Sequence, residues 1–363
     1  MKRRVTALVL SIAMALVLAA CGTGNTPGSA GGQAGGSTGG QTGGSPQEDS
    51  YTMRIGWTEA NDPDSCPASF AIYHFKDIVE ERSKGRIKVE LFGGGQLGTQ
   101  QEMMEQVQQG VLEASLAAPL MNIYPDFNLF NTPFLVSDVK TMRTIFDPTG
   151  DYWAEFIAPV NEATGLKCMG ICFEGLRHLT NSKREVRVPA DISDLKIRVQ
   201  DKAVCIETWN VLGCSATPIS WNEVYSALQT HVCDGQENPL FNIAYANLQE
   251  VQSYLTLTGH ELCFTPFVIN GSWYSALPAD LQAVIDECST EFINTEVGKV
   301  DEREAAALTD LENAGMTITE LTDEEHQAWV DGCQAHMIEW ISDSMTHPEL
   351  LKDVMSRIAA VEG

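Results

Sequence analysis

An arginine in a short run of alternating residues is the first candidate for binding chemistry. In LKIRVQ, residues 195–200, apolar and polar residues alternate as they do in a strand with one buried face. Arg198 then lies on the polar face with Lys196 and Gln200. A guanidinium is a planar fork of donors that matches a carboxylate through two hydrogen bonds. From these residues alone, Arg198 either faces bulk water, as expected for Lys196, or holds an acidic ligand.

Catalytic and metal-binding patterns are absent from the sequence. It has no Gly-x-Ser-x-Gly elbow, HExxH helix, Walker loop or dinucleotide-binding glycine fingerprint. Cys168, Cys172 and His178 could ligate a metal, but there is no tight CxxC pair. The acidic stretch 61–64 lacks the turn glycine and the terminal glutamate of a calcium loop. We therefore expect no enzymatic activity, no cofactor and no metal site.

The start of the chain has the pattern of an export signal. Residues 1–20 combine a basic beginning, an apolar run and small residues before Cys21. The sequence LAAC at 18–21 resembles a bacterial lipobox, which predicts that Cys21 is lipidated and anchors the chain to a membrane surface. The alternative is an ordinary signal peptide that a cysteine happens to follow. Residues 21–50, rich in Gly, Ser, Thr and Gln, are expected to form a flexible tether.

Charge and cysteine content narrow the possible partners. The formal net charge is −26, and no stretch beyond the signal concentrates Lys and Arg, so nucleic-acid binding is not expected. Ten cysteines include Cys21, which leaves an odd number in the body. Four residues of strand between Cys168 and Cys172 span about 13 Å, too far for a disulfide. We expect most of these cysteines to be small core residues.

The body from Tyr51 onward alternates strands and helices. This alternation over roughly 310 residues favours an α/β fold with mainly parallel sheets and two lobes. Capping boxes are expected at Thr99 with Glu102 and at Ser220 with Glu223. Strands are expected at 51–57, 86–92, 112–119, 166–173 and 195–200, twice within 252–270, and at 316–321. Helices are expected at 68–85, 99–110, 201–213, after 220 and at 278–315, with two acidic helices at the end.

Seven stretches of the body carry a joint signal, namely FKDIVEERSKGRIKVELFGGGQLG, GLRHLTNSKREV, LKIRVQ, PISWNEVYSALQT, VCDGQENPL, EVQSYLTLTGH and LPADLQAVI. In this order they resemble the solute-binding subunits of tripartite ATP-independent periplasmic (TRAP) transporters, the dicarboxylate-receptor family. The resemblance implies a two-lobe, type II periplasmic-binding-protein-like fold that closes like a hinge, with one long helix bracing both lobes. It places the first lobe at 51–174 plus 264–303 and the second at 175–263 plus 304–363.

The resemblance also implies a carboxylate ligand and its contacts in the second lobe. Arg198 matches the family's ligand-binding arginine on a strand. Arg177 matches a second arginine, which could instead pair with an acidic neighbour. Asn238 matches a cleft asparagine, which could instead form the turn before proline. Trp221 stands where relatives carry phenylalanine and either forms an aromatic wall over the ligand or packs under the helix start.

Contacts from the first lobe are less specific. Relatives carry His-Pro in the loop after the first strand, where this chain has Asp62-Pro63. Trp57 and Glu59 in this loop are candidate ligand contacts, and so are Asn122 and Tyr124 further along. Glu59 could accept hydrogen bonds from ligand hydroxyls or be an exposed loop acid.

These features predict an extracytoplasmic receptor, lipid-anchored to the outer face of the cell membrane. It would bind a small organic acid and deliver it to integral membrane TRAP subunits driven by an ion gradient. A binding module of a sensor, or of another transporter class, is the alternative.

Overall fold

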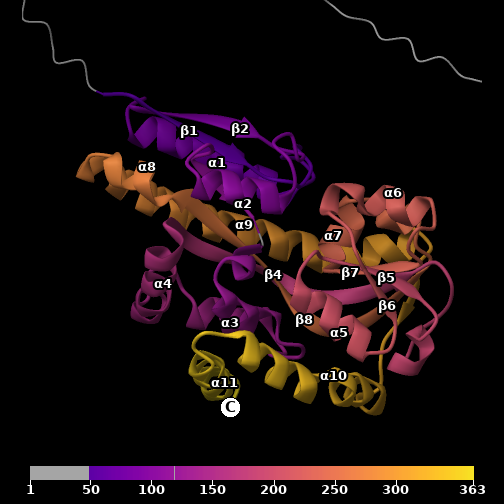
Figure 1. Cartoon of the computed structure of the whole chain (residues 1–363). Coiled ribbons are helices and arrows are strands. Elements are labelled where there is room, and N and C mark those ends of the chain that lie inside the picture. Colours follow the sequence, from indigo (N-terminus) through magenta and orange to yellow (C-terminus); the bar gives the residue numbers. More distant parts are fainter. Residues whose placement is uncertain (1–48, 118) are drawn as a thin grey trace, which may run out of the picture. The chain divides into compact units, whose positions relative to one another are not determined.

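A nine-stranded mixed sheet forms the centre of the computed structural model, which describes residues 49–117 and 119–363 (Figure 1). Along the sheet the strands follow the order β2-β1-β3-β8-β4-β7-β5-β6, and β9 pairs with β8. The strands are β1 (Tyr51–Gly56), β2 (Ile87–Phe92), β3 (Ala114–Leu116), β4 (Leu166–Asn181), β5 (Lys196–Val199), β6 (Ser215–Pro218), β7 (Gly235–Asn238), β8 (Tyr254–Asn270) and β9 (Thr317–Thr319).

Two long strands join the two ends of this sheet. β4 and β8, of 16 and 17 residues, pair antiparallel along their length. Parallel pairs flank them on both sides, β2-β1-β3 at one end and β7-β5-β6 at the other. The α/β class is confirmed, but β4 continues through GLRHLTN, and the two runs expected in 252–270 are one strand. The register of β4 against β8 shifts between Phe173 and Gly175, and Gly175 takes a φ of 136° that favours glycine.

The predicted helices form, with one error at a helix start. α2 (Gln100–Gln108) begins at Thr99, and both hydrogen bonds of the Thr99–Glu102 capping box are present. The box predicted at Ser220 is wrong, because the Ser220 side chain caps no N–H group. Instead the Ser220 carbonyl accepts from the Glu223 N–H, at 3.1 Å, which closes the 3-10 turn η4 (Trp221–Glu223) before α6 (Val224–Gln229).

Further helices complete the layers on the sheet and have the following bounds. They are α1 (Pro67–Arg82), η1 (Pro119–Asn122), η2 (Pro125–Asn131), α3 (Val139–Ile145), α4 (Asp151–Thr164), η3 (Pro189–Ile192), α5 (Ala203–Val211), α7 (Leu240–Tyr245), η5 (Leu248–Glu250), α8 (Gly271–Ala276), α10 (Asp323–Ser344) and α11 (Glu349–Glu362).

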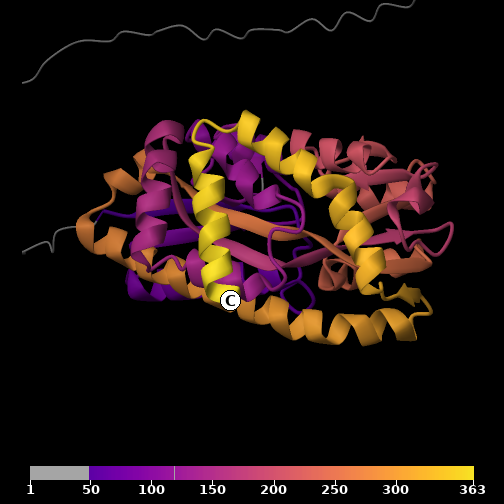
Figure 2. The ribbon, with the colours of Figure 1, turned by 90° about the horizontal axis from the view of Figure 1, so that it is seen from below.

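The long helix predicted after Pro278 is α9 (Ala279–Asn313), of 35 residues. At 1.5 Å per residue it reaches roughly 52 Å. Figures 1 and 2 show it running along the sheet from the side of β1 and β2 to the side of β5 and β7. Near its end, the Glu304 carboxylate accepts from the backbone N–H groups of Leu240 and Phe241, at 3.3 and 2.8 Å. α9 therefore holds the start of α7.

Buried cysteines contribute to the core, as predicted. The nine cysteines of the described residues are free and buried, at positions 66, 168, 172, 205, 214, 233, 263, 288 and 333. Burial raises the pKa of several of these thiols, to about 12 for Cys168, so they behave as small apolar side chains. Within residues 49–117 and 119–363, no helix is both long and apolar enough to cross a membrane.

Candidate functional site

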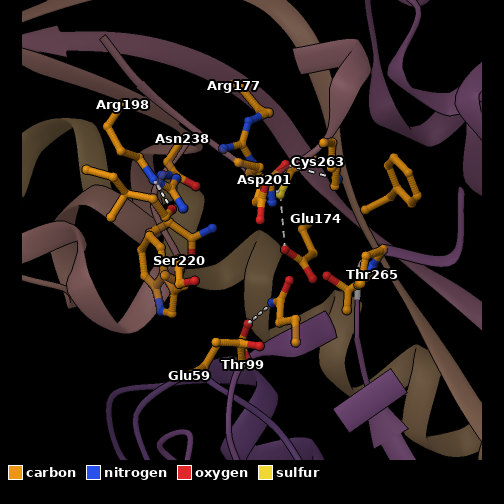
Figure 3. A pocket seen from close by; sticks show the side chains of 18 of the residues that line it. Glu59, Thr99, Glu174, Arg177, Arg198, Asp201, Ser220, Asn238, Cys263 and Thr265 are labelled. Atoms are coloured by element: carbon orange, nitrogen blue, oxygen red, sulfur yellow. Dashed lines mark hydrogen bonds between the residues drawn. The ribbon is translucent and has the colours of Figure 1, made fainter. Parts of the chain in front are cut away.

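A cavity of about 90 Å³ opens beside β4 and β8, between β5 and β7 on one side and the loop after β1 on the other (Figure 3). This volume is several times the roughly 10–15 Å³ that one water molecule needs, so the cavity can hold a small organic molecule. Its walls come from β4, β5, β7 and β8, from the start of α2, from α7, and from the loops that follow β1 and β6. Segments far apart in the sequence therefore share one site.

Arg198 lies in this wall and is buried, with 2% of its surface exposed. Its Nε donates to the Ile219 carbonyl at 2.8 Å, but its Nη1 is buried without a hydrogen-bond partner. Burial lowers the pKa of Arg198 to about 10, so the group is still charged at neutral pH. Lys196, on the same strand, is exposed, as predicted. The water-facing alternative for Arg198 is wrong.

Arg177 lines the same cavity, but its guanidinium is already hydrogen-bonded within the protein. Its Nε and Nη2 donate to the carboxylate of Glu237, and its Nη1 donates to Cys263 Sγ at 3.2 Å. Burial alone would raise the pKa of Glu237, but the Arg177 charge and His260 outweigh burial and hold it at about 2. The acidic-neighbour alternative for Arg177 thus describes its contacts, although the residue borders the cavity.

Asn238 and Trp221 also border the cavity. Asn238 ends β7, and its Nδ2 donates to Gln236 Oε1 at 2.5 Å. Trp221 is half-buried in η4, with its ring 6.2 Å from that of Tyr245. An aromatic wall is therefore present at the cavity, made of Trp221 and Tyr245 together.

Glu59 is brought to the cavity by the loop after β1. Its Oε1 is 3.4 Å from Thr58 Oγ1 and from Gln100 Nε2, and its Oε2 is buried without a partner. Burial, followed by repulsion from Glu174, raises the pKa of Glu59 to about 7. The exposed-acid alternative does not describe this carboxylate.

Trp57, Asn122 and Tyr124 do not line the cavity. Trp57 is fully buried and donates from Nε1 to Ser69 Oγ at 3.1 Å, and its ring packs so closely under Gly93 that a Cβ there would lie 2.2 Å away. It belongs to the core, which corrects the prediction. Asn122 donates to Gln101 Oε1 at 2.8 Å, and Gln101 is the side chain that borders the cavity.

Other cavity residues were missed from the sequence. Lys202 is 4% exposed, donates to Gln200 Oε1 at 3.0 Å and lies 5.0 Å from the centre of the Phe264 ring. It follows β5 directly, and the rule that ligands bind at the carboxyl ends of parallel strands could have identified it. Glu174 and Tyr245 carried no such signal.

The remaining sequence candidates are not part of this cavity. Cys21 and the export signal lie outside the described residues. His178 accepts from the Gly259 N–H at 3.1 Å, and burial lowers the pKa of His178 to about 3. Across the part of the chain that the structure describes, no three His, Cys, Asp or Glu side chains are grouped to hold a metal ion.

Comparison with known proteins agrees with the fold. Residues 60–343 match the family model for the bacterial extracellular solute-binding protein, family 7. A solute-binding protein of Verminephrobacter eiseniae is 35% identical over 275 residues, which are 75% of this chain and 80% of that protein. The 2,3-diketo-L-gulonate-binding periplasmic protein of Escherichia coli is 29% identical over 84% of this chain and 91% of its own.

A solved structure shares the fold over most of its length. The sugar acid binding protein of Advenella mimigardefordensis, in complex with galactonate, superimposes with a TM-score of 0.80 at 28% identity, over 86% of this chain and 99% of that one. Together these findings define a solute receptor of the TRAP type. The chain belongs to family 7 of the bacterial extracellular solute-binding proteins, which confirms the predicted two-lobe fold and receptor class and does not support the sensor alternative.

Proposed function

We propose that this receptor binds a small organic acid in the cavity at Arg198 and delivers it to integral membrane TRAP subunits. The observation that carries this proposal is the buried Nη1 of Arg198, which has no hydrogen-bond partner. A buried cation with an unused donor favours an anionic ligand, since an unpaired buried polar group costs about 1–3 kcal/mol. The galactonate bound to the Advenella protein supports a carboxylate as the ligand's acidic group.

The geometry supports a division of roles among the cavity residues. Arg198 would hold the carboxylate, Asn238 would add a polar contact, and Trp221 with Tyr245 would cover an apolar side of the ligand. Charge-assisted hydrogen bonds strengthen when water is excluded, so closure of the two lobes would tighten each of them.

The lobes and the anchor are part of the proposal. We assign residues 51–174 plus 264–303 to one lobe and 175–263 plus 304–363 to the other, with β4, β8 and α9 crossing between them. Placement of β1–β3 and β5–β7 at opposite ends of the sheet supports this division. Lipidation of Cys21 would hold the receptor at the outer face of the membrane, with residues 21–50 as its tether, and mass spectrometry of the membrane fraction would detect the modified cysteine.

A thermal-shift screen against organic acids tests the binding function. The protein is first unfolded and refolded in reductant to remove any bound ligand. A ligand at a hundred times its dissociation constant adds about 2.7 kcal/mol to stability, which raises the melting temperature by several degrees. We expect an organic acid to give this shift with wild type and with Lys196→Ala, the matched control on the same strand, and not with Arg198→Ala. Shifts with neutral sugars alone would contradict the proposal.

A further inference from the structure

The ligand cavity continues into a small second pocket that is lined by acids. Glu59 and Glu174 border both spaces, together with Tyr245 and Asn242. Glu296, from α9, borders the second pocket alone. In Figure 3, Glu59 and Glu174 lie across the open space from Arg198 and Asn238. The carboxyl groups of Glu59, Glu174 and Glu296 thus gather at the end of the site away from Arg198.

No positively charged side chain of the described residues forms a hydrogen bond or ion pair with these three acids. Glu174 accepts from Cys263 Sγ at 3.2 Å, and Glu59 is contacted by Thr58 and Gln100. The nearest cations form their hydrogen bonds with other groups and act on Glu174 and Glu296 only through charge at longer range. Arg143 binds Asp301 and the Phe173 carbonyl, Arg177 binds Glu237 and Cys263, and Lys202 binds Gln200.

Three polar oxygens around this pocket also lack hydrogen-bond partners. They are Oε2 of Glu59, Oε2 of Glu296 and the hydroxyl oxygen of Tyr245. Glu296 is 1% exposed, so bulk water does not satisfy it. Buried polar atoms are nearly always paired in native proteins. Three unpaired oxygens around a single pocket therefore favour a ligand group that donates several hydrogen bonds.

We propose that this acidic pocket binds a protonated amine of the ligand, which is therefore a zwitterion with its carboxylate at Arg198. An ammonium group offers three N–H donors and one positive charge, which match the three unpartnered oxygens and three acids that no cationic side chain of the described residues contacts directly. A hydroxyl would offer only one donor to the three unpartnered oxygens. Among the described residues, no three His, Cys, Asp or Glu side chains are grouped to hold a metal ion, so a metal is not the expected occupant of this pocket.

This inference rests on the proposed function, because it takes Arg198 as the carboxylate contact. Its test is calorimetric titration of the refolded full chain with matched pairs of acids that differ in one group. The pairs are alanine with lactate, 4-aminobutyrate with 4-hydroxybutyrate, and 5-aminopentanoate with 5-hydroxypentanoate. We expect the amino acid of at least one pair to bind ten-fold or more tightly than its hydroxy partner.

Isosteric variants locate the preference within the pocket. Glu174→Gln and Glu296→Gln should each reduce the amino-over-hydroxy ratio at least five-fold. Glu287→Gln, an exposed position of α9, should leave the ratio unchanged. Thermal melts of each variant show whether it folds. If a variant does not fold, the comparison of amino and hydroxy acids with the wild-type protein still tests the proposal.

The outcomes separate this inference from the proposed function. If hydroxy acids bind as well as or better than amino acids, and Arg198→Ala abolishes that binding, the acidic pocket does not select a cation and the receptor function stands. If no acid of any pair binds, whereas a neutral compound does so independently of Arg198, both proposals are wrong.

Discussion

Arg177 and Glu237 form a buried ion pair between β4 and β7, in which Nε and Nη2 of the arginine reach the two carboxylate oxygens. Both side chains are about 2% exposed. The pair makes the two arginines of the cavity unequal, since Arg177 is neutralised by the protein itself and Arg198 has a donor left over. Under the proposed function, Arg198 is therefore the arginine with a donor available for a ligand carboxylate.

Replacing Arg198 by lysine should weaken ligand binding roughly 10- to 100-fold. An ammonium cannot form the bidentate contact, and one charge-assisted hydrogen bond is worth about 1.5–3 kcal/mol. Calorimetry with the acid found in the thermal screen measures the change. Lys196→Arg on the same strand is the control, and wild-type affinity in Arg198→Lys would contradict a bidentate clamp.

Breaking the Arg177–Glu237 pair should destabilise the fold. Glu237→Gln leaves a buried guanidinium without its counter-charge, which costs roughly 3–5 kcal/mol in the free energy of unfolding. Urea denaturation measures this loss. The exposed pair Arg357–Asp353 gives the comparison, because Asp353→Asn should cost less than about 1 kcal/mol. Equal effects at the two sites would show that burial adds nothing to the inner pair.

Glu304 should make stability fall as pH rises toward neutral. Burial raises the pKa of Glu304 to about 7, above its ordinary value of 4.5, although two backbone N–H groups partly offset this. A raised folded-state pKa gives a contribution that is complete below pH 4.5 and is lost as pH rises through 7. Glu304→Gln should reduce this decline in urea midpoints measured between pH 5 and 8, and Glu59, whose pKa is also raised to about 7, contributes to the decline that remains. An unchanged pH profile in the variant would assign the decline to another group.

Binding of a zwitterion should strengthen as pH rises from 6 to 8. Burial and Glu174 hold the pKa of Glu59 near 7, and a cationic ligand needs the ionised form, so binding releases protons in this range. Glu174, Glu296, Cys66 and Tyr245 face the same pocket. A ligand without the amine should show the opposite trend. Titrations in buffers of different ionisation enthalpy count the protons, and proton uptake with an amino acid would contradict the trend.

Sequence patterns predicted those parts of the fold that are stabilised by contacts between residues close together in the chain. The Thr99–Glu102 box and the length of α9 follow from side-chain spacing, and both form as expected. The Ser220 box fails because a 3-10 turn places the backbone differently after the same residue types. The first long strand was expected to end at 173, and 252–270 was expected to hold two strands, whereas β4 and β8 continue through Gly175 and Gly259, which take positive φ values.

The site residues also divide into those that local sequence patterns predict and those that only tertiary packing brings together. Arg198 could be proposed because strand alternation and family resemblance both mark it. Glu59, Glu174, Tyr245 and Glu296 come from four separate segments, so their proximity arises only when β4, α7 and α9 pack together. Trp57 was misplaced because a tryptophan after a strand fits a binding loop and a core equally well, and only packing under Gly93 decides between them.

The crossing of β4 and β8 between the two ends of the sheet bears on the order of folding. β3 pairs with β8, so the N-terminal edge of the sheet lacks its partner until residues 254–270 are available. The opposite edge connects through β7 to β4, which itself pairs with β8 along its length. A chain that emerges N-terminus first cannot join the two ends of the sheet until β8 is available, and such long-range pairing folds slowly. Translocation through a narrow pore, which requires an unfolded chain, would benefit from that delay.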